Sequence, residues 1–273
     1  MKKSFPVKKP LGQITRGKTA RNRLRRVDNF LLMYAHSLLR AKYEGFQHAF
    51  YVDLGYGAEP FTTLESAERL RSVNPTLPVL GVEIEQDRVD NAKPFEDETT
   101  FFRLGGFNLP LKSGETVRLI RAFNVLRQYE ESEVVPSLQL MGEYVSEGGL
   151  IIEGTSDPFG RIWVANLLRK ESGELKVEGL LFSTNFRWGF EPALFQPVLP
   201  KNHIHRMIPG EMIYDFMENW KRASLETIAF REWGIRRWFI AAATRLGQAG
   251  YSLELRTKYL RRGYLLWKID NLN

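Results

Sequence analysis

The feature that most constrains the fold is an alternation of strand and helix patterns that begins near residue 49. Residues 49–52 (AFYV) are strand formers and lead into the turn Val52-Asp53-Leu54-Gly55-Tyr56-Gly57. Residues 62–73 then repeat apolar side chains at helical spacing, opened by a capping-box pattern at Thr62, and residues 78–84 form a second strand pattern. A strand–glycine turn–helix–strand unit of this kind predicts parallel strands.

The alternation continues over most of the chain. Further strands are expected at 99–104, 117–123 and 150–153, and helices at 86–93 and 133–145, the last closed by Gly148-Gly149. After Gly160 the pattern changes to an antiparallel ribbon (162–168 and 175–183), two helices (211–230 and 232–246) and two strands (251–256 and 264–269). The pattern predicts an α/β fold with a mostly parallel seven-stranded sheet, helices on both faces, and a β-ribbon and helical insertion after strand five.

Positive charge is concentrated at the two ends of the chain. Residues 1–26 carry ten Lys and Arg and no acidic residue, while the whole chain has a net charge of +7. We expect a basic N-terminal arm at 1–26 and one domain at 27–273, with its core at 49–153 and 247–270 and an insertion at 160–246. The arm is either a solvated tail or a segment that closes over an anionic substrate.

The chain has no cysteine, which excludes disulfides, thiolate metal sites and cysteine nucleophiles. It shows no apolar signal-peptide core and no 18-residue apolar run, so we expect a cytoplasmic protein without a membrane partner. No metal site is expected, since His203 and His205 stand in a loop without further ligand candidates.

The glycine turn fits S-adenosylmethionine better than a dinucleotide. A dinucleotide loop needs a third glycine, where this chain has Pro60, and Asp53 would repel a pyrophosphate. S-adenosylmethionine is cationic at its sulfonium and ammonium groups, and Glu83 at the end of the second strand can accept both ribose hydroxyls. The alternative is structural: Asp53 caps its turn and Glu83 is a solvated strand end.

On these residues the chain resembles the class I S-adenosylmethionine-dependent methyltransferases, which have a Rossmann-like fold. The resemblance covers residues 49–153, with strands six and seven expected from 251–269. It implies a site whose cofactor-binding residues are Asp53, Gly55, Tyr56, Gly57, Glu83, Ile84, Gly106, Phe107 and Asn124. Gly106 departs from the family, which often has an acidic residue there for the adenine amino group. Phe107 could stack on the adenine instead, and Asn108 or a backbone carbonyl could meet its amino group.

Two pairs of motifs are similar to a little-characterised bacterial subgroup of this family. They are residues 15–19 (TRGKT) with 22–26 (NRLRR), and residues 205–206 (HR) with 209–211 (PGE). The subgroup's substrate does not follow from the resemblance.

The sequence limits the chemical class of the methyl acceptor mainly by exclusion. No Asn-Pro-Pro-Tyr segment follows strand four and no cysteine is present, which leaves transfer to an O or N of an unidentified acceptor, and the oligomeric state is open. If the acceptor is a hydroxyl, the candidate general bases are His205, Asp157 and Glu153, with His203 also considered. The structural alternatives are a loop hydrogen bond, a loop-capping Asp and a strand-end Glu.

The basic C-terminal region suggests a second function. Arg231, Trp233, Arg236, Arg237 and Trp238 combine arginines with aromatics, as single-stranded nucleic-acid surfaces do. We prefer the alternative in which Trp233 and Phe239 are core residues. An RNA-binding protein or RNA methyltransferase therefore stays open, and a nucleotide-dependent oxidoreductase ranks below both.

Overall fold

The structure, a computed structural model, describes residues 9–43 and 45–272, and its packing divides the chain into two compact units. The first unit holds the described residues up to Ala122 together with Pro136–Leu150. The second holds Phe123–Val135 and the residues from Ile151 onward. Within the described ranges, no helix combines the length and apolar character that a membrane crossing needs.

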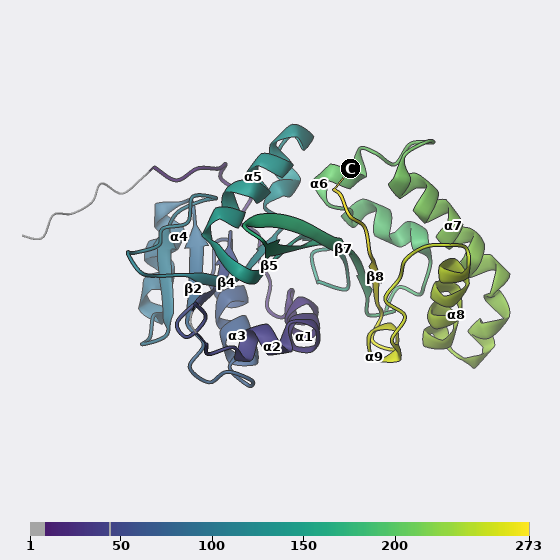
Figure 1. Ribbon diagram of the computed structural model, residues 1–273, viewed down its shortest axis with the longest axis horizontal. Coiled ribbons are helices and arrows are strands. Elements are labelled where there is room, and N and C mark those ends of the chain that lie inside the picture. The colour runs from purple at the N-terminus through teal and green to yellow at the C-terminus, as the bar shows by residue number, and fades with distance from the viewer. Residues whose placement is uncertain (1–8, 44, 273) are drawn as a thin grey trace, which may run out of the picture. The chain divides into compact units, whose positions relative to one another are not determined.

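Parallel strands form the framework of the first unit (Figure 1). The strands are β1 (Phe50–Leu54), β2 (Val79–Glu83), β3 (Thr100–Leu104) and β4 (Val117–Phe123). Val52 pairs with Leu80 on one side and with Ile120 on the other. Every residue of β1 and β2 is buried, as expected of parallel strands that are covered on both faces.

Helices alternate with these strands as the sequence predicts. They are α1 (Arg25–Tyr34), α2 (His36–Arg40), α3 (Phe61–Leu70), α4 (Gln86–Ala92) and α5 (Glu131–Tyr144). Two local predictions are wrong. Helix α3 begins at Phe61 with Pro60 at its N-cap, so Thr62 is not a capping residue and its hydroxyl bonds to Asp53 instead. Strand β5 begins at Val145, so Gly148 and Gly149 lie inside a strand and do not end the helix before it.

The sheet has eight strands in the order β3-β2-β1-β4-β5-β6-β7-β8. Strands β5 (Val145–Ser156), β6 (Ile162–Glu171), β7 (Glu174–Thr184) and β8 (Tyr264–Trp267) complete it, and the β6–β7 and β7–β8 pairs are antiparallel. The expected ribbon exists, but its strands are members of the main sheet. The prediction of seven mostly parallel strands is therefore wrong, and the sheet is mixed.

The strand expected at 251–256 is absent from the described structure, where only an isolated bridge joins Leu253 to Trp267. Tyr251 packs its ring edge-on against Phe216 at 5.2 Å between ring centroids. The apolar pattern of this segment thus reflects side-chain packing on an aromatic core and not a strand ladder.

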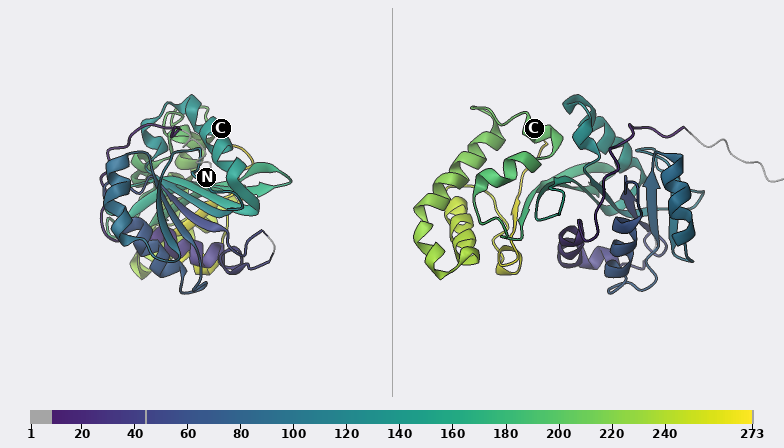
Figure 2. Two further views of the ribbon diagram at one scale, coloured as in Figure 1. Left: turned by 90° about the vertical axis from the view of Figure 1, so that its left-hand side faces the viewer. Right: turned by 180° about the vertical axis from the view of Figure 1, so that it is seen from behind.

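Helices cover the antiparallel part of the second unit. They are α6 (Lys201–Ile204), α7 (Met212–Glu226), α8 (Ile235–Gln248) and α9 (Thr257–Leu260), with the 3-10 helix η4 (Ile228–Trp233) between α7 and α8. Helices α7 and α8 lie side by side in Figures 1 and 2. Their inner faces bury an aromatic core in which Phe216 stacks on Trp267 at 4.0 Å and lies 5.8 Å from Trp220.

Candidate cofactor site

The turn after β1 has the backbone geometry that its glycines suggest. Gly55 and Gly57 have φ angles of 71° and 95°, which an L side chain rarely adopts. Tyr56 between them is buried; its hydroxyl donates to the carbonyl of Arg88 at 3.2 Å and its ring packs edge-on against Phe102. The turn therefore presents backbone, and not the Tyr56 side chain, to its surroundings.

Asp53, expected to face the cofactor, is held in a buried ion pair. Its Oδ2 lies 2.8 Å from Nη2 of Arg121 and accepts hydrogen bonds from the Thr62 and Thr63 hydroxyls at 2.9 and 2.8 Å. Its Oδ1 accepts from Nε of Arg121 at 3.1 Å. In this structure Asp53 positions the turn after β1 and the start of α3, as in the structural alternative.

Arg121 extends this network to α1. Its Nη1 lies 2.6 Å from Asp28, and Asp28 also pairs with Arg69 at 2.9 Å and accepts from the Ser66 hydroxyl. Burial alone would lower the pKa of Arg121, but the Asp53 and Asp28 carboxylates outweigh burial and raise it. Burial raises the pKa of Asp28 although both arginines oppose the rise. No pattern in the sequence signals that Asp28 joins this cluster.

Glu83 lies at the end of β2 beside the glycine turn and is only 1% exposed. Its Oε2 accepts the backbone N–H of Gly57 at 3.0 Å, and its Oε1 accepts the N–H of Ile84 at 3.0 Å and Nη1 of Arg88 at 3.4 Å. Burial raises the pKa of Glu83, partly offset by these amides and by Arg88. A carboxylate has about four acceptor positions, so Glu83 keeps acceptor capacity for a ligand hydroxyl.

Gly106 and Phe107 follow β3, where the chain's own N-terminal segment crosses them. The N–H of Phe107 donates to the carbonyl of Leu11 at 2.9 Å, and Asn108 bonds to Leu11 N and Lys9 O. A Cβ at position 106 would lie 2.0 Å from the Leu11 carbonyl oxygen, so no acidic side chain fits there while the segment is in place. Phe107 is 5% exposed. The passage of the segment is the physical reason for the glycine that departs from the family pattern.

The same segment continues along the glycine turn. The carbonyl of Gly17 accepts the N–H of Ala58 at 2.9 Å, and Nη2 of Arg88 donates to the carbonyl of Thr15 at 2.9 Å. Asn22 is tied to α3 through Glu65. The described part of the basic arm is thus packed on the first unit and is not a solvated tail; residues 1–8 lie outside the described residues.

In the second unit, Asn124 has a strained backbone directly after β4. Its φ is 61°, and its N–H donates to the carbonyl of Gly154 at 2.7 Å. Its side chain exchanges hydrogen bonds with Ser156, from Nδ2 to Oγ at 3.2 Å and from the Ser156 N–H to Oδ1 at 3.0 Å. These bonds hold Asn124 in a left-handed conformation, which is uncommon outside glycine and is frequent at functional sites.

The three candidate bases have different environments. Asp157 accepts the backbone N–H groups of Phe159, Arg161 and Ile162, so it caps its own loop. His205 is exposed at the end of α6. Glu153 is 1% exposed and burial raises its pKa to about 7.

Glu153 belongs to a buried polar cluster that the sequence does not signal. Asn166 donates to Oε2 of Glu153 at 2.9 Å and to Asn202 at 3.0 Å, and His203 Nε2 lies 3.1 Å from the Asn166 side-chain oxygen. Burial lowers the pKa of His203 to about 3, so the imidazole is neutral at pH 7. Oε1 of Glu153 has no hydrogen-bond partner among the described residues.

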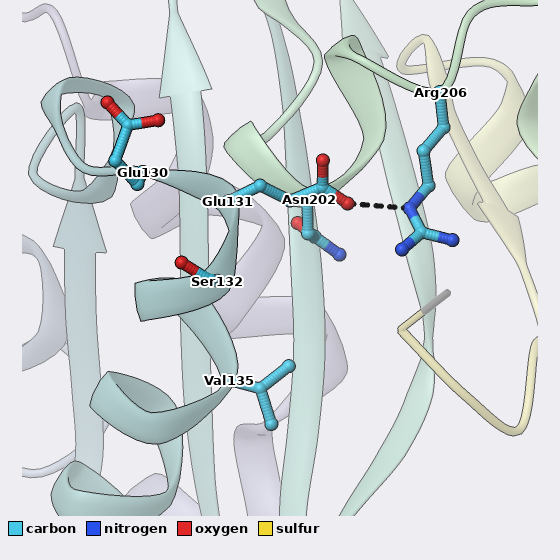
Figure 3. Close-up of a pocket in the computed structure, with 6 residues that line it drawn as sticks. All are labelled: Glu130, Glu131, Ser132, Val135, Asn202 and Arg206. Carbon is cyan, nitrogen blue, oxygen red and sulfur yellow. Dashed lines mark hydrogen bonds and ion pairs between the residues drawn. The ribbon is translucent and has the colours of Figure 1, made fainter.

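A hollow of about 590 Å³ opens beside this cluster (Figure 3). Its lining is Glu130, Glu131, Ser132, Val135, Asn202 and Arg206. Arg206 reaches toward Glu131, with Nε 2.7 Å from Oε1, and lies 3.6 Å from Glu211. Because two carboxylates neutralise Arg206, the hollow has no excess positive charge for an anionic ligand. The ion pair between Arg206 and Glu211 joins the two motifs at 205–206 and 209–211.

A second hollow of about 470 Å³ lies between the 188–192 loop and helices α7, η4 and α8. Trp188 and Arg231 line it, and Trp233 stands on the same η4 helix with 70% exposure. The expectation that Trp233 is a core residue is therefore wrong, because η4 turns it outward. Trp238 occupies the interior instead, 8% exposed, with its indole N–H donating to the carbonyl of Ser224.

No model of a protein family matches the chain, and no curated protein sequence is similar to it. Solved structures do resemble part of it. Magnesium protoporphyrin IX methyltransferase from Synechocystis PCC 6803, with bound S-adenosylhomocysteine, is 15% identical over 49% of this chain and 54% of its own, with a TM-score of 0.36. Human N-acetylserotonin methyltransferase in complex with S-adenosylmethionine is 20% identical over 50% and 39%, with a TM-score of 0.32.

A third structure, from Plasmodium falciparum with S-adenosylhomocysteine, is assigned to protein-L-isoaspartate O-methyltransferase. It is 16% identical over 55% of this chain and 64% of its own, with a TM-score of 0.33. The chain thus spans less than two thirds of the length of each of these three structures. All three hold S-adenosylmethionine or S-adenosylhomocysteine.

Proposed function

We propose that the protein is an S-adenosylmethionine-dependent methyltransferase that moves a methyl group to an O or N of an unidentified acceptor. The observation that carries the proposal is the position of Glu83, buried at the end of β2 with its carboxylate against the N–H of Gly57. An acidic side chain there, next to a glycine turn at the carboxyl ends of parallel strands, suits a ligand with a ribose and no phosphate.

The residues present fit this cofactor in part. Glu83 would accept one ribose hydroxyl at its remaining acceptor position, and Gly55 and Gly57 let the backbone approach the ligand. Asp53 pairs with Arg121 and stabilises the glycine turn, and we do not expect it to contact the ligand. When bound, the cofactor supplies an electrophilic methyl group, and the protein's part is to hold the acceptor in line with it.

For a hydroxyl acceptor, Glu153 is the base that we propose among the three candidates. Its raised pKa of about 7 suits proton transfer near neutral pH, whereas three backbone amides already occupy the carboxylate of Asp157. His205, which is exposed, is the second candidate for the general base.

The test is binding followed by transfer. Calorimetry with S-adenosylhomocysteine should show binding to the wild-type protein and at least a tenfold loss for Glu83→Ala, since a hydrogen bond to a charged acceptor is removed. The exposed Glu98→Ala in the same unit is the matched control and should bind normally. Binding of NAD in place of S-adenosylhomocysteine, or equal affinity in Glu83→Ala, would overturn the proposal. Incubation with tritium-labelled S-adenosylmethionine and fractionated extract then shows which class of molecule takes the methyl group.

One observation favours single-stranded nucleic acid as the acceptor. Trp188 and Arg231 line the 470 Å³ hollow of the second unit, Arg161 contacts Trp188, and Phe230 and Trp233 stand on the same 3-10 helix as Arg231. We name this the aromatic–arginine face; its residues are Phe159, Arg161, Trp188, Phe230, Arg231 and Trp233. Arg161 lies over the rings of Phe159 and Trp188 at 4.6 and 5.3 Å, and Phe230 packs edge-on against Trp233. Exposed aromatics stack bases and arginines bind the phosphates between them.

The nucleic-acid hypothesis has its own test. Oligo(U) and oligo(dT) should quench tryptophan fluorescence with an affinity that falls as salt rises, and Trp233→Ala with Trp188→Ala should weaken both. Trp220→Phe, which is buried in the core, serves as the fluorescence control. Affinity that does not change in the double variant would exclude this face as the binding surface.

A further inference from the structure

The N-terminal segment brings an unexplained hydroxyl to the glycine turn. Oγ1 of Thr19 is shielded from solvent and has no hydrogen-bond partner among residues 9–43 and 45–272. A hydroxyl left unpaired inside a protein is destabilising, and such groups are uncommon in native structures. The position of Thr19 therefore calls for a partner that the described residues do not supply.

Thr19 lies directly against the proposed site. Its Cβ is 3.5 Å from the place that a Cβ on Gly57 would occupy. Gly57 is also the residue whose N–H binds Glu83, so Thr19 and Glu83 flank the same turn. Two hydrogen bonds fix the segment there, from Ala58 N to Gly17 O and from Arg88 to Thr15 O.

The glycine at position 17 shows how closely the segment is fitted. Its φ is 65°, and a Cβ there would lie 2.6 Å from the guanidinium carbon of Arg88. Arg88 in turn binds Glu83 and Glu85. Arg88 thus connects the segment to Glu83. Residues 15–19 are therefore packed against the proposed site.

We propose that residues 15–19 form one wall of the cofactor site and that the Thr19 hydroxyl binds the amino-acid end of S-adenosylmethionine. This inference rests on the proposed function. The amino-acid end carries a carboxylate and an ammonium group, and a hydroxyl can donate to the first or accept from the second. Asp53 is neutralised by Arg121, so the turn itself offers no free charged group for that end of the ligand. In the proposed function, Glu83 binds the ribose and not the amino-acid end.

Thr19→Val tests the proposal, because valine keeps the shape and loses the hydroxyl. Two probes separate the ends of the ligand: S-adenosylhomocysteine has the amino-acid end, and 5′-methylthioadenosine lacks it. By calorimetry, Thr19→Val should bind S-adenosylhomocysteine about tenfold more weakly, the loss expected for one hydrogen bond to a charged group. Its affinity for 5′-methylthioadenosine should equal that of the wild-type protein, and Thr19→Ser should restore the affinity for S-adenosylhomocysteine.

The outcomes are distinguishable. Wild-type protein that binds neither probe overturns the proposed function and this inference with it. Wild-type protein that binds both, with Thr19→Val unchanged toward S-adenosylhomocysteine, overturns the role of Thr19 alone. An equal loss for both probes shows that Thr19 acts only by shaping the segment, and this also overturns the binding role.

Discussion

Arg121 holds Asp53 through an ion pair, with Nη2 2.8 Å from Oδ2, and a hydrogen bond from Nε to Oδ1 at 3.1 Å, and neither side chain is more than 3% exposed. The carboxylate of Asp53 is therefore engaged in contacts within the protein. Asp53, which the sequence predicts to bind the ligand, instead connects the end of β1 to the start of α3. The same guanidinium reaches Asp28 of α1, so one cation joins three elements of the first unit.

Asp53→Ala should destabilise the protein even without a ligand. The variant leaves Arg121 buried with one carboxylate in place of two and removes the acceptor of two threonine hydroxyls. Breaking a buried pair from one side costs about 3–5 kcal/mol. Urea unfolding should show this loss, and Asp53→Asn, which keeps part of the hydrogen bonding, should lose less. A change below about 1 kcal/mol would mean that Asp53 faces the ligand site after all.

Arg118→Met should also destabilise the first unit. Arg118 is buried and donates to the carbonyls of Leu38, Leu39, Ala41, Phe46 and Ala49, which close the α2–β1 connection. Burial lowers its pKa to about 10, so it remains charged at pH 7. Unfolding of Arg118→Met in urea should show a loss of about 3 kcal/mol, because several buried carbonyls lose their donor. The exposed Arg40→Met is the control and should change stability by less than about 0.5 kcal/mol.

Gly106→Ala should detach the N-terminal segment from β3. The added Cβ would lie 2.0 Å from the Leu11 carbonyl oxygen, which must move and release the N–H of Phe107. Hydrogen exchange of Phe107 should therefore accelerate, and trypsin should cleave more readily after Arg16 and Lys18. Leu11→Ala keeps the backbone carbonyl and removes a side chain that is 50% exposed, so it should leave exchange unchanged. Normal protection in Gly106→Ala would contradict the observed path of the segment.

Glu153→Gln should remove part of the pH dependence of stability. Burial raises the pKa of Glu153 from 4.5 to about 7, so the folded state favours its protonated form. This contribution is present below pH 4.5 and is lost as the pH rises through 7, by about 3 kcal/mol in total. His203, in the same cluster, acts oppositely: its lowered pKa costs stability as the pH falls from 6.5 to about 3. The wild-type protein should therefore lose stability between pH 5 and pH 8 relative to Glu153→Gln.

Urea midpoints at pH 5, 6, 7 and 8 for both proteins give this comparison. The difference between the two curves isolates Glu153, because His203 is present in both. Parallel curves across the range would show that Glu153 is ionised throughout and would remove the reason to prefer it as a base.

The local sequence pattern was sufficient to predict most strands and helices of the first unit. Its strands are short apolar runs, and its helices repeat apolar residues at helical spacing. It failed at Thr62, where a distant carboxylate on β1 competes for the hydroxyl that would cap the helix. It failed again at 251–256, because Tyr251 and Leu253 are apolar for packing against α7 and β8 and not for strand pairing. It misplaced Trp233 for a related reason: the sequence predicts one helix over 232–246, but η4 ends at Trp233 and the helix α8 begins only at Ile235, after Gly234.

The sequence by itself determined that the chain has a glycine turn after a buried strand and a carboxylate after the next one, because both depend on local backbone preferences and short spacing. Only the tertiary structure decided which charged groups are free. Asp53 meets Arg121 across 68 residues of sequence, and Leu11 meets Phe107 across a still longer separation, and no local pattern encodes such contacts. Burial sets the cost of leaving a polar group unpaired, so only the packed segment shows why position 106 is glycine and that the Thr19 hydroxyl has no partner among the described residues.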